Sequence, residues 1–226
     1  MEAYESEFIE FLFDKGVIKT DGPYKLKSGR ISPYFLDFGE LMGNTETLSK
    51  LSDFCVSAIE RKIGCGNFDL IVGPPEKGKL LSLAIGSRIF ERYGKPKNIT
   101  YLRKLPKGHG ESKGESWFYG AEPQPTDRVL VVDDVYTEGT SVKECKKRLE
   151  DFGRELEVGP LEYVATFVLV DRQESEDTVY SIVTVSDIFL HPAARRSLGE
   201  GLDRCVRYLQ ENGNSAARSR SNTLEL

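Results

Sequence analysis

Two adjacent carboxylates, Asp133 and Asp134, directly follow a run of apolar residues at 129–132. The next polar segment, residues 137–141, contains one glycine and three hydroxyl side chains. Gly139 allows the backbone to approach a ligand closely, and the N–H groups that open the following helix attract an anion. Adjacent carboxylates suit sugar hydroxyls, or a hydrated Mg²⁺ ion attached to the ligand. The segment therefore predicts a site for a phosphorylated sugar.

The segment 129–141 resembles the motif with which type I phosphoribosyltransferases bind phosphoribosyl pyrophosphate (PRPP). The resemblance implies that the acid pair meets the ribose hydroxyls and that the loop 137–141 holds the 5-phosphate. Tyr136 and Glu138 depart from this motif, in which small or aliphatic residues are common. We expect the Glu138 carboxylate to face solvent, because a carboxylate that pointed inward would repel the phosphate.

Three further segments, 26–35, 103–111 and 169–174, resemble the N-terminal signature, the catalytic loop and the late strand end of orotate phosphoribosyltransferases. Their order and spacing agree with that family from Tyr4 to about Leu190. The resemblance implies transfer of the 5-phosphoribosyl group from PRPP to orotate. The products would be orotidine 5′-phosphate and pyrophosphate, in pyrimidine nucleotide biosynthesis.

The residue types fit both substrates. PRPP is densely anionic and calls for cationic side chains, whereas orotate is a flat ring with a carboxylate. Phe35 can stack on that ring, and Arg172 can hold its acidic or carbonyl edge. The predicted PRPP-binding residues are Lys27, Lys77, Arg103, Lys104, Lys107, His109, Asp133, Asp134, Thr137, Glu138, Gly139, Thr140 and Ser141. The predicted orotate-binding residues are Lys27, Phe35, Thr137 and Arg172, and the predicted catalytic residues are Lys107, His109, Asp133 and Asp134.

The resemblance also implies a cofactor and an assembly. Mg²⁺ is expected to be held mainly by the substrate, with help from Asp133 and Asp134. The chain is expected to form a homodimer with a shared active site, in which the glycine-containing loop 105–116 closes over PRPP. Two other functions fit the same motif: phosphoribosyl transfer to another nucleobase, and PRPP binding by a non-catalytic regulator. Lys107 and His109 in the loop favour catalysis.

Two departures from the family pattern concern the pocket. Pro75 and Glu76 stand where an Ala-Tyr pair is usual, and Leu36 stands where a second aromatic residue often follows Phe35. Glu76 beside a pyrophosphate is expected to weaken PRPP binding unless its carboxylate turns away or pairs with a lysine.

Near-continuous apolar runs predict the elements that position these residues. The runs at 70–72, 99–102, 129–132, 164–170 and 180–185 are typical of strands that are buried on both faces. Helical spacing of apolar residues appears at 2–14, after Asn44, at 142–152 and at 198–209. This alternation predicts an α/β fold like that of type I phosphoribosyltransferases: a mostly parallel central sheet flanked by helices, with a small N-terminal hood. Ligands of such sheets bind at the carboxyl ends of the strands.

Length and composition narrow the remaining possibilities. The 226 residues suggest a single domain at 1–212, with a hood contributed largely by 1–40, and a small, polar, disordered tail at 213–226. The net charge of -5 argues against a dedicated nucleic-acid binder. No apolar run approaches the roughly 20 residues of a membrane span, and no secretion signal opens the chain. Four cysteines without a CxxC pair suggest reduced thiols, so we expect a cytoplasmic protein.

Overall fold

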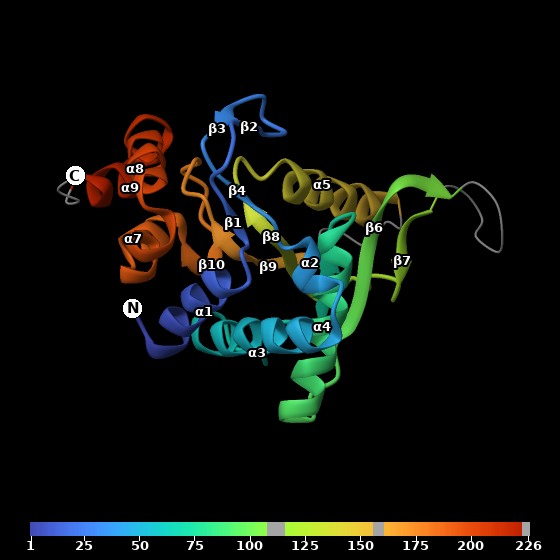
Figure 1. Ribbon diagram of the computed structural model, residues 1–226. Helices are drawn as coiled ribbons and strands as arrows, with labels where there is room; N and C mark the ends of the chain where they lie inside the picture. Colours follow the sequence, from blue (N-terminus) through green and yellow to red (C-terminus); the bar gives the residue numbers. More distant parts are fainter. Residues whose placement is uncertain (108–115, 156–160, 223–226) are drawn as a thin grey trace.

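A six-stranded sheet forms the centre of the molecule, and its strand order is β10-β9-β8-β5-β6-β7 (Figure 1). The computed structural model describes residues 1–107, 116–155 and 161–222, without the side chains of 106, 107, 116 and 155. Neighbouring strands are parallel except β6 and β7, which are antiparallel. The strands are β5 (Leu70–Gly73), β6 (Asn98–Lys107), β7 (Ser116–Gly120), β8 (Arg128–Tyr136), β9 (Glu162–Asp171) and β10 (Tyr180–Thr184). The prediction of a mostly parallel α/β sheet is confirmed.

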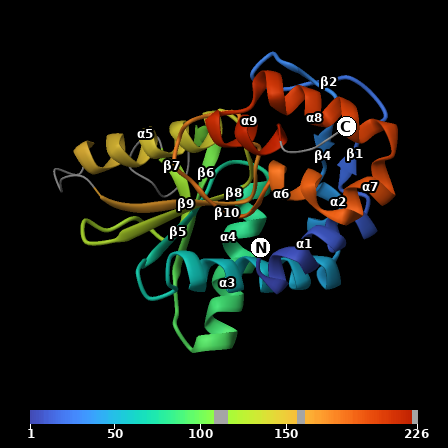
Figure 2. The same ribbon diagram turned by 90° about the vertical axis from the view of Figure 1, so that its left-hand side faces the viewer.

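Helices cover both faces of this sheet. In Figures 1 and 2, α5 (Thr140–Glu155) lies on one face, and α3 (Thr45–Lys62) and α4 (Lys77–Tyr93) lie on the other. Alternate residues of β8 therefore enter different cores: Leu130 and Val132 pack with the residues of α3 and α4, whereas Val129 and Val131 pack with those of α5. Burial on both faces explains why the apolar runs are continuous in the sequence.

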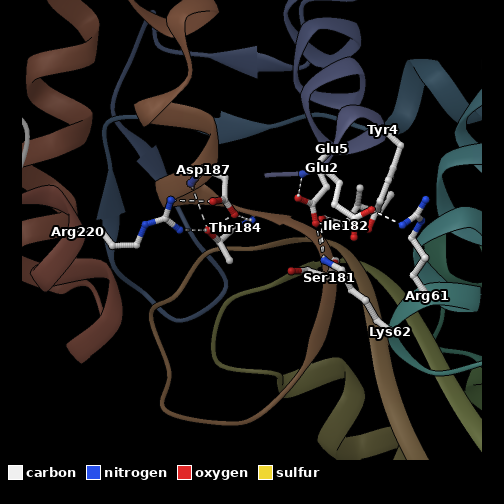
Figure 3. Close-up of polar contacts among 10 residues, drawn as sticks. All are labelled: Glu2, Tyr4, Glu5, Arg61, Lys62, Ser181, Ile182, Thr184, Asp187 and Arg220. Atoms are coloured by element: carbon white, nitrogen blue, oxygen red, sulfur yellow. Dashed lines mark hydrogen bonds and ion pairs between the residues drawn. The ribbon is translucent and has the colours of Figure 1, made fainter.

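The predicted hood region contains one helix followed by short strands. α1 (Ala3–Asp14) packs against α3 and β10, and α2 (Gly39–Met42) closes the region. Between them, β1 (Ile18–Lys19) pairs with β4 (Phe35–Leu36), and β2 (Tyr24–Lys25) pairs with β3 (Ile31–Ser32). Figure 3 shows how α1 is anchored: Lys62 Nζ donates to Glu5 Oε1 at 2.9 Å and to the carbonyls of Ser181 and Ile182 in β10.

The prediction of a disordered tail at 213–226 does not hold for the helix at Ser215–Ser221, whereas residues 223–226 lie outside the described residues. α9 (Ser215–Ser221) follows α6 (Val185–Leu190), α7 (Pro192–Leu198) and α8 (Glu200–Asn212). Asn214 caps α9 by accepting from the Ala217 N–H, and Ala217 is fully buried. Arg220 pairs with Asp187 at 2.8 Å (Figure 3). The small residues of α9 let it pack closely on α8, and the ion pair of Arg220 with Asp187 holds it in place. The polar local sequence alone therefore wrongly indicates disorder for this helix.

Two further properties follow from the described part of the chain. None of its helices is both long and apolar enough to cross a membrane. All four cysteines are buried and carry free thiols. The boundary of the single domain at residue 212 stays a prediction.

Candidate active site

A cavity of about 470 Å³ lies at the carboxyl ends of β5, β8 and β9, with the hood beside it. Of the predicted site residues whose side chains the structure describes, all line it except Arg103 and Lys104. The sheet therefore brings together segments that are far apart in sequence, as expected for an α/β fold. The lining residues are Lys25, Leu26, Lys27, Ser28, Phe35, Leu36, Pro75, Glu76, Lys77, residues 133–142, and Arg172.

The acid pair ends the buried part of β8. The Asp133 side chain is almost fully buried, and its Oδ1 accepts from the Asp134 N–H at 3.0 Å. Lys77, the first residue of α4, places its Nζ 2.9 Å from Asp134 Oδ2. Burial and the neighbouring charge of Asp134 raise the pKa of Asp133 to about 7. The two carboxylates therefore differ: Asp134 shares an ion pair, whereas Asp133 holds a proton unusually tightly.

The segment 137–141, called the phosphate loop below, requires glycine at one position. Gly139 has a φ of 72°, and a Cβ there would lie 2.1 Å from Tyr136 Oη. The Tyr136 hydroxyl is held by Asp177, to whose Oδ2 it donates at 2.9 Å. Because α5 begins at Thr140, the first N–H groups of this helix open onto the loop. The arrangement suits an anion such as a phosphate.

The turn between β5 and α4 is equally tight. A Cβ on Gly73 would lie 2.2 Å from the carbonyl oxygen of Gly78, so this position also excludes larger residues. Glu76 has a φ of 71°, a conformation that non-glycine residues adopt rarely. Its Oε1 lies 2.6 Å from Lys104 Nζ, and this hydrogen bond and charge lower the pKa of Glu76. From the sequence, we expect the Glu76 carboxylate either to turn away or to pair with a lysine. The structure shows the ion pair with a lysine.

Arg172 is far more enclosed than a free substrate-binding cation. Its side chain is 2% exposed, with the guanidinium 4.1 Å from the centre of the Tyr34 ring. Nε donates to Glu174 Oε1 at 2.7 Å, and Nη2 donates to Ser32 Oγ at 2.9 Å. These partners fix the guanidinium at the edge of the cavity. Glu174 offsets part of the positive charge of Arg172. The sequence pattern did not indicate this ion pair.

Phe35 offers a flat, accessible surface on the hood side of the cavity. Its side chain is 38% exposed, and the Tyr24 ring stacks behind it with centroids 5.6 Å apart. The hydroxyl of Ser28 is buried nearby without a hydrogen-bond partner among the described residues. Lys25 and Ser28 are lining residues that our sequence analysis did not include in the site, although Lys25 lies two residues before Lys27 and Ser28 directly follows it.

Two of the described predicted residues, Arg103 and Lys104, do not line the cavity. Arg103 donates to the carbonyl oxygen of Phe118 at 3.4 Å and lies over the Tyr119 ring, 4.9 Å from its centre. Lys104 reaches the cavity wall only through Glu76. Lys107 is the last residue of β6, but its side chain, like all of His109 and most of the predicted closing loop, lies outside the described residues.

The pKa of Asp133 predicts a gain in stability on mutation. Since it lies above the unfolded value of about 3.9, folding of the wild type becomes less favourable as the pH rises from about 4 to 7. Asp133→Asn removes this penalty. We expect the ligand-free variant to melt at least about 2 °C above the wild type near pH 8, with a much smaller difference near pH 4. The exposed Asp203→Asn is the matched control, and an equal gain at both pH values would contradict the interpretation.

The chain is similar to several known proteins, although no family model matches it. It is 36% identical over 174 residues to the orotate phosphoribosyltransferase of Pasteurella multocida, covering 77% of this chain and 74% of that protein. It is 31% identical to the enzyme of the same name from Nitrosococcus oceani, over 94% of this chain and 97% of the relative.

A crystal structure of orotate phosphoribosyltransferase from Francisella tularensis has the same fold. The TM-score is 0.65 at 26% identity, and the match covers 92% of this chain and 96% of that one. The fold and the resemblance in four separate motifs agree with these relatives. The chain belongs to the orotate phosphoribosyltransferase family.

Proposed function

We propose that this protein transfers the 5-phosphoribosyl group from PRPP to orotate, giving orotidine 5′-phosphate and pyrophosphate. The observation that carries the proposal is that one cavity joins three features. These are the acid pair at the end of β8, the phosphate loop at a helix start, and the enclosed Arg172 together with Phe35. A phosphorylated sugar and a flat acidic base need these features side by side.

Different residues of the cavity bind different parts of the two substrates. The phosphate loop and the N-terminal end of α5 bind the 5-phosphate, and Asp133 and Asp134 hold the ribose hydroxyls. Phe35 stacks on the orotate ring, while Arg172, Lys27 and Thr137 bind its polar edge. Pyrophosphate is bound by cationic side chains, of which Lys27 and Lys77 line the cavity. The other members of the proposed group are Arg103, Lys104, Lys107 and His109.

In the reaction, the bond from ribose C1 to the pyrophosphate oxygen breaks and its electron pair leaves with pyrophosphate. A ring nitrogen of orotate forms the new bond to C1 and loses its proton. Positive charge develops on the ribose next to Asp133 and Asp134, and negative charge develops on the leaving group beside the lysines. Catalysis then consists of positioning and charge stabilisation, without a covalent protein intermediate.

Mg²⁺ fits this site as a cofactor. Magnesium in proteins is usually bound by one or two carboxylates together with substrate oxygens and water, and two carboxylates stand here at the cavity wall. Asp133 and Asp134 would hold the ion jointly with PRPP. When bound, the ion neutralises charge on the pyrophosphate.

A second copy of the chain is the proposed partner, with the active site shared between the two. α4 carries Leu80, Leu83 and Phe90 on one side, and these side chains are 45%, 58% and 58% exposed. Such an apolar helix face is typical of an interface, and two-fold dimers are the commonest assembly. Arg103 lies beside Tyr119 rather than in its own cavity, which agrees with a role in the neighbouring site. We place the protein in the cytoplasm.

The reaction itself is tested by following the loss of orotate absorbance. The assay contains protein, PRPP, orotate and Mg²⁺, and each component is omitted in turn. We expect absorbance loss only in the complete mixture, and a loss of orders of magnitude in turnover for Asp133→Asn combined with Asp134→Asn. Transfer to adenine, guanine or uracil instead would favour the other-nucleobase alternative. PRPP binding without transfer would favour the regulator.

The pair of Glu76 and Lys104 predicts a competition with PRPP. Glu76→Gln frees a lysine and removes a negative charge, so the KM for PRPP should fall by about twofold to fivefold, as for an exposed ion pair. The KM for orotate should stay unchanged. Lys104→Met is the complementary variant, and we expect it to raise the KM for PRPP. An unchanged KM in Glu76→Gln would show that the pair is incidental.

A shared site predicts complementation between inactive variants. Lys107→Ala and Asp133→Asn are each expected to be inactive alone. If the loop acts in trans, each mixed dimer has one site with both intact residues, so co-refolding should restore about a quarter of wild-type activity. If the loop acts within its own chain, every site keeps one defect. No recovery, with subunit exchange demonstrated by tagged chains, would rule out the shared site.

A further inference from the structure

The phosphate loop contains an acid, Glu138, whose charge is opposite to what a phosphate site needs. Glu138 lines the cavity and is about 39% exposed, so it only partly faces solvent as expected. Its Oε1 lies 2.9 Å from Arg30 Nη2. Arg30 belongs to the hood, 108 positions earlier in the sequence, and sequence analysis did not identify it as a site residue.

The second terminal nitrogen of the Arg30 guanidinium is bound to a fully buried carboxylate. Arg30 Nη1 donates to Glu174 Oε2 at 3.1 Å, and the Glu174 side chain is 0% exposed. The same oxygen accepts from the Tyr208 hydroxyl at 3.1 Å, and Oε1 accepts from Arg172 Nε. Residues after β9, in α8 and in the hood therefore all donate to Glu174, and Glu174 gives Arg30 a rigid anchor.

A second cation close to Glu138, Lys143, does not pair with the Glu138 carboxylate. Lys143 Nζ donates to the main-chain carbonyl of Glu138 at 2.8 Å, and it pairs with Asp177 at 2.8 Å. Among the described residues, the Glu138 carboxylate is ion-paired with Arg30. Loss of Arg30 would leave this carboxylate uncompensated beside the phosphate position.

We propose that Arg30 is a positioning residue for PRPP, which neutralises Glu138 at the phosphate loop and ties that loop to the Glu174–Arg172 pair. The inference rests on the proposed function. A phosphate monoester carries close to two negative charges near neutral pH, so an uncompensated carboxylate a few ångströms away opposes binding. Arg30 removes that opposition while its bond to Glu174 holds the loop and the orotate end in register.

The test is a double-mutant cycle of wild type, Arg30→Gln, Glu138→Gln and the double variant. We expect Arg30→Gln to raise the KM for PRPP about tenfold with a smaller change in kcat. The double variant should return the KM for PRPP toward the wild-type value, because the repelling charge is gone. Arg196→Gln is the matched control, since Arg196 forms a 2.9 Å pair with Glu10 away from the cavity. Its KM should not change.

Rescue distinguishes compensation of charge from simple support of the fold. If Arg30 acted only as a structural link, Glu138→Gln could not repair its loss, and an unrescued KM would overturn the proposal. So would an unchanged KM in Arg30→Gln. If Arg30→Gln fails to fold, as judged by its melting curve, Glu138→Gln alone decides. It should lower the KM for PRPP by releasing Arg30, and an increase would refute the idea. An inactive wild type would instead refute the proposed function.

Discussion

Burial of the Asp133 carboxylate beside Asp134 at the end of β8 is the constraint on which the rest of the site depends. The hydrophobic strand carries Asp133 to a place with little water, where burial and the charge of Asp134 both oppose ionisation. Cations must therefore approach this strand end. Lys77 does so from the start of α4 by pairing with Asp134, and Lys27 in the hood lies near enough to lower the pKa of Asp133. The hood and the start of α4 thus each bring a cation to the acids at the end of β8.

That convergence explains the tight turns around the cavity. The chain between β5 and α4 folds back so closely that Gly73 nearly touches the carbonyl of Gly78, and Glu76 takes up a rare backbone conformation. Strain of this kind persists where surrounding structure imposes it, and it is common at binding sites. Gly139 has the same role in the phosphate loop, where Tyr136 leaves no room for a side chain. At these positions the backbone is restricted to rare or tightly packed conformations, and these conformations place N–H groups and charged side chains at the cavity.

Much of this arrangement could be predicted from the sequence, because its signals are local. The five apolar runs correspond to strands, and the acid pair, the phosphate loop, Phe35 and Arg172 line one cavity as expected. What could not be predicted depends on contacts between distant segments. No local pattern pairs Arg30 with Glu138, and α9 is held by packing on α8 and by the pair of Arg220 with Asp187. The position of Arg103 over Tyr119 depends on the antiparallel pairing of β6 and β7, and the aromatic run at 117–119 was not recognised from the sequence as the second strand.

The ion pairs of the cavity differ in how readily a substrate can exchange them. Lys104 and Glu76 form an exposed pair, which solvent screens, so an incoming anion can replace the carboxylate at little cost. Arg172 and Glu174 form a pair that is nearly inaccessible, and separating it would leave a buried charge without a partner. In the proposed site, Arg172 would therefore bind orotate while it remains paired with Glu174. Exchangeable cations suit the pyrophosphate end, where the product has to leave. A fixed cation suits the base end, where selectivity depends on constant geometry.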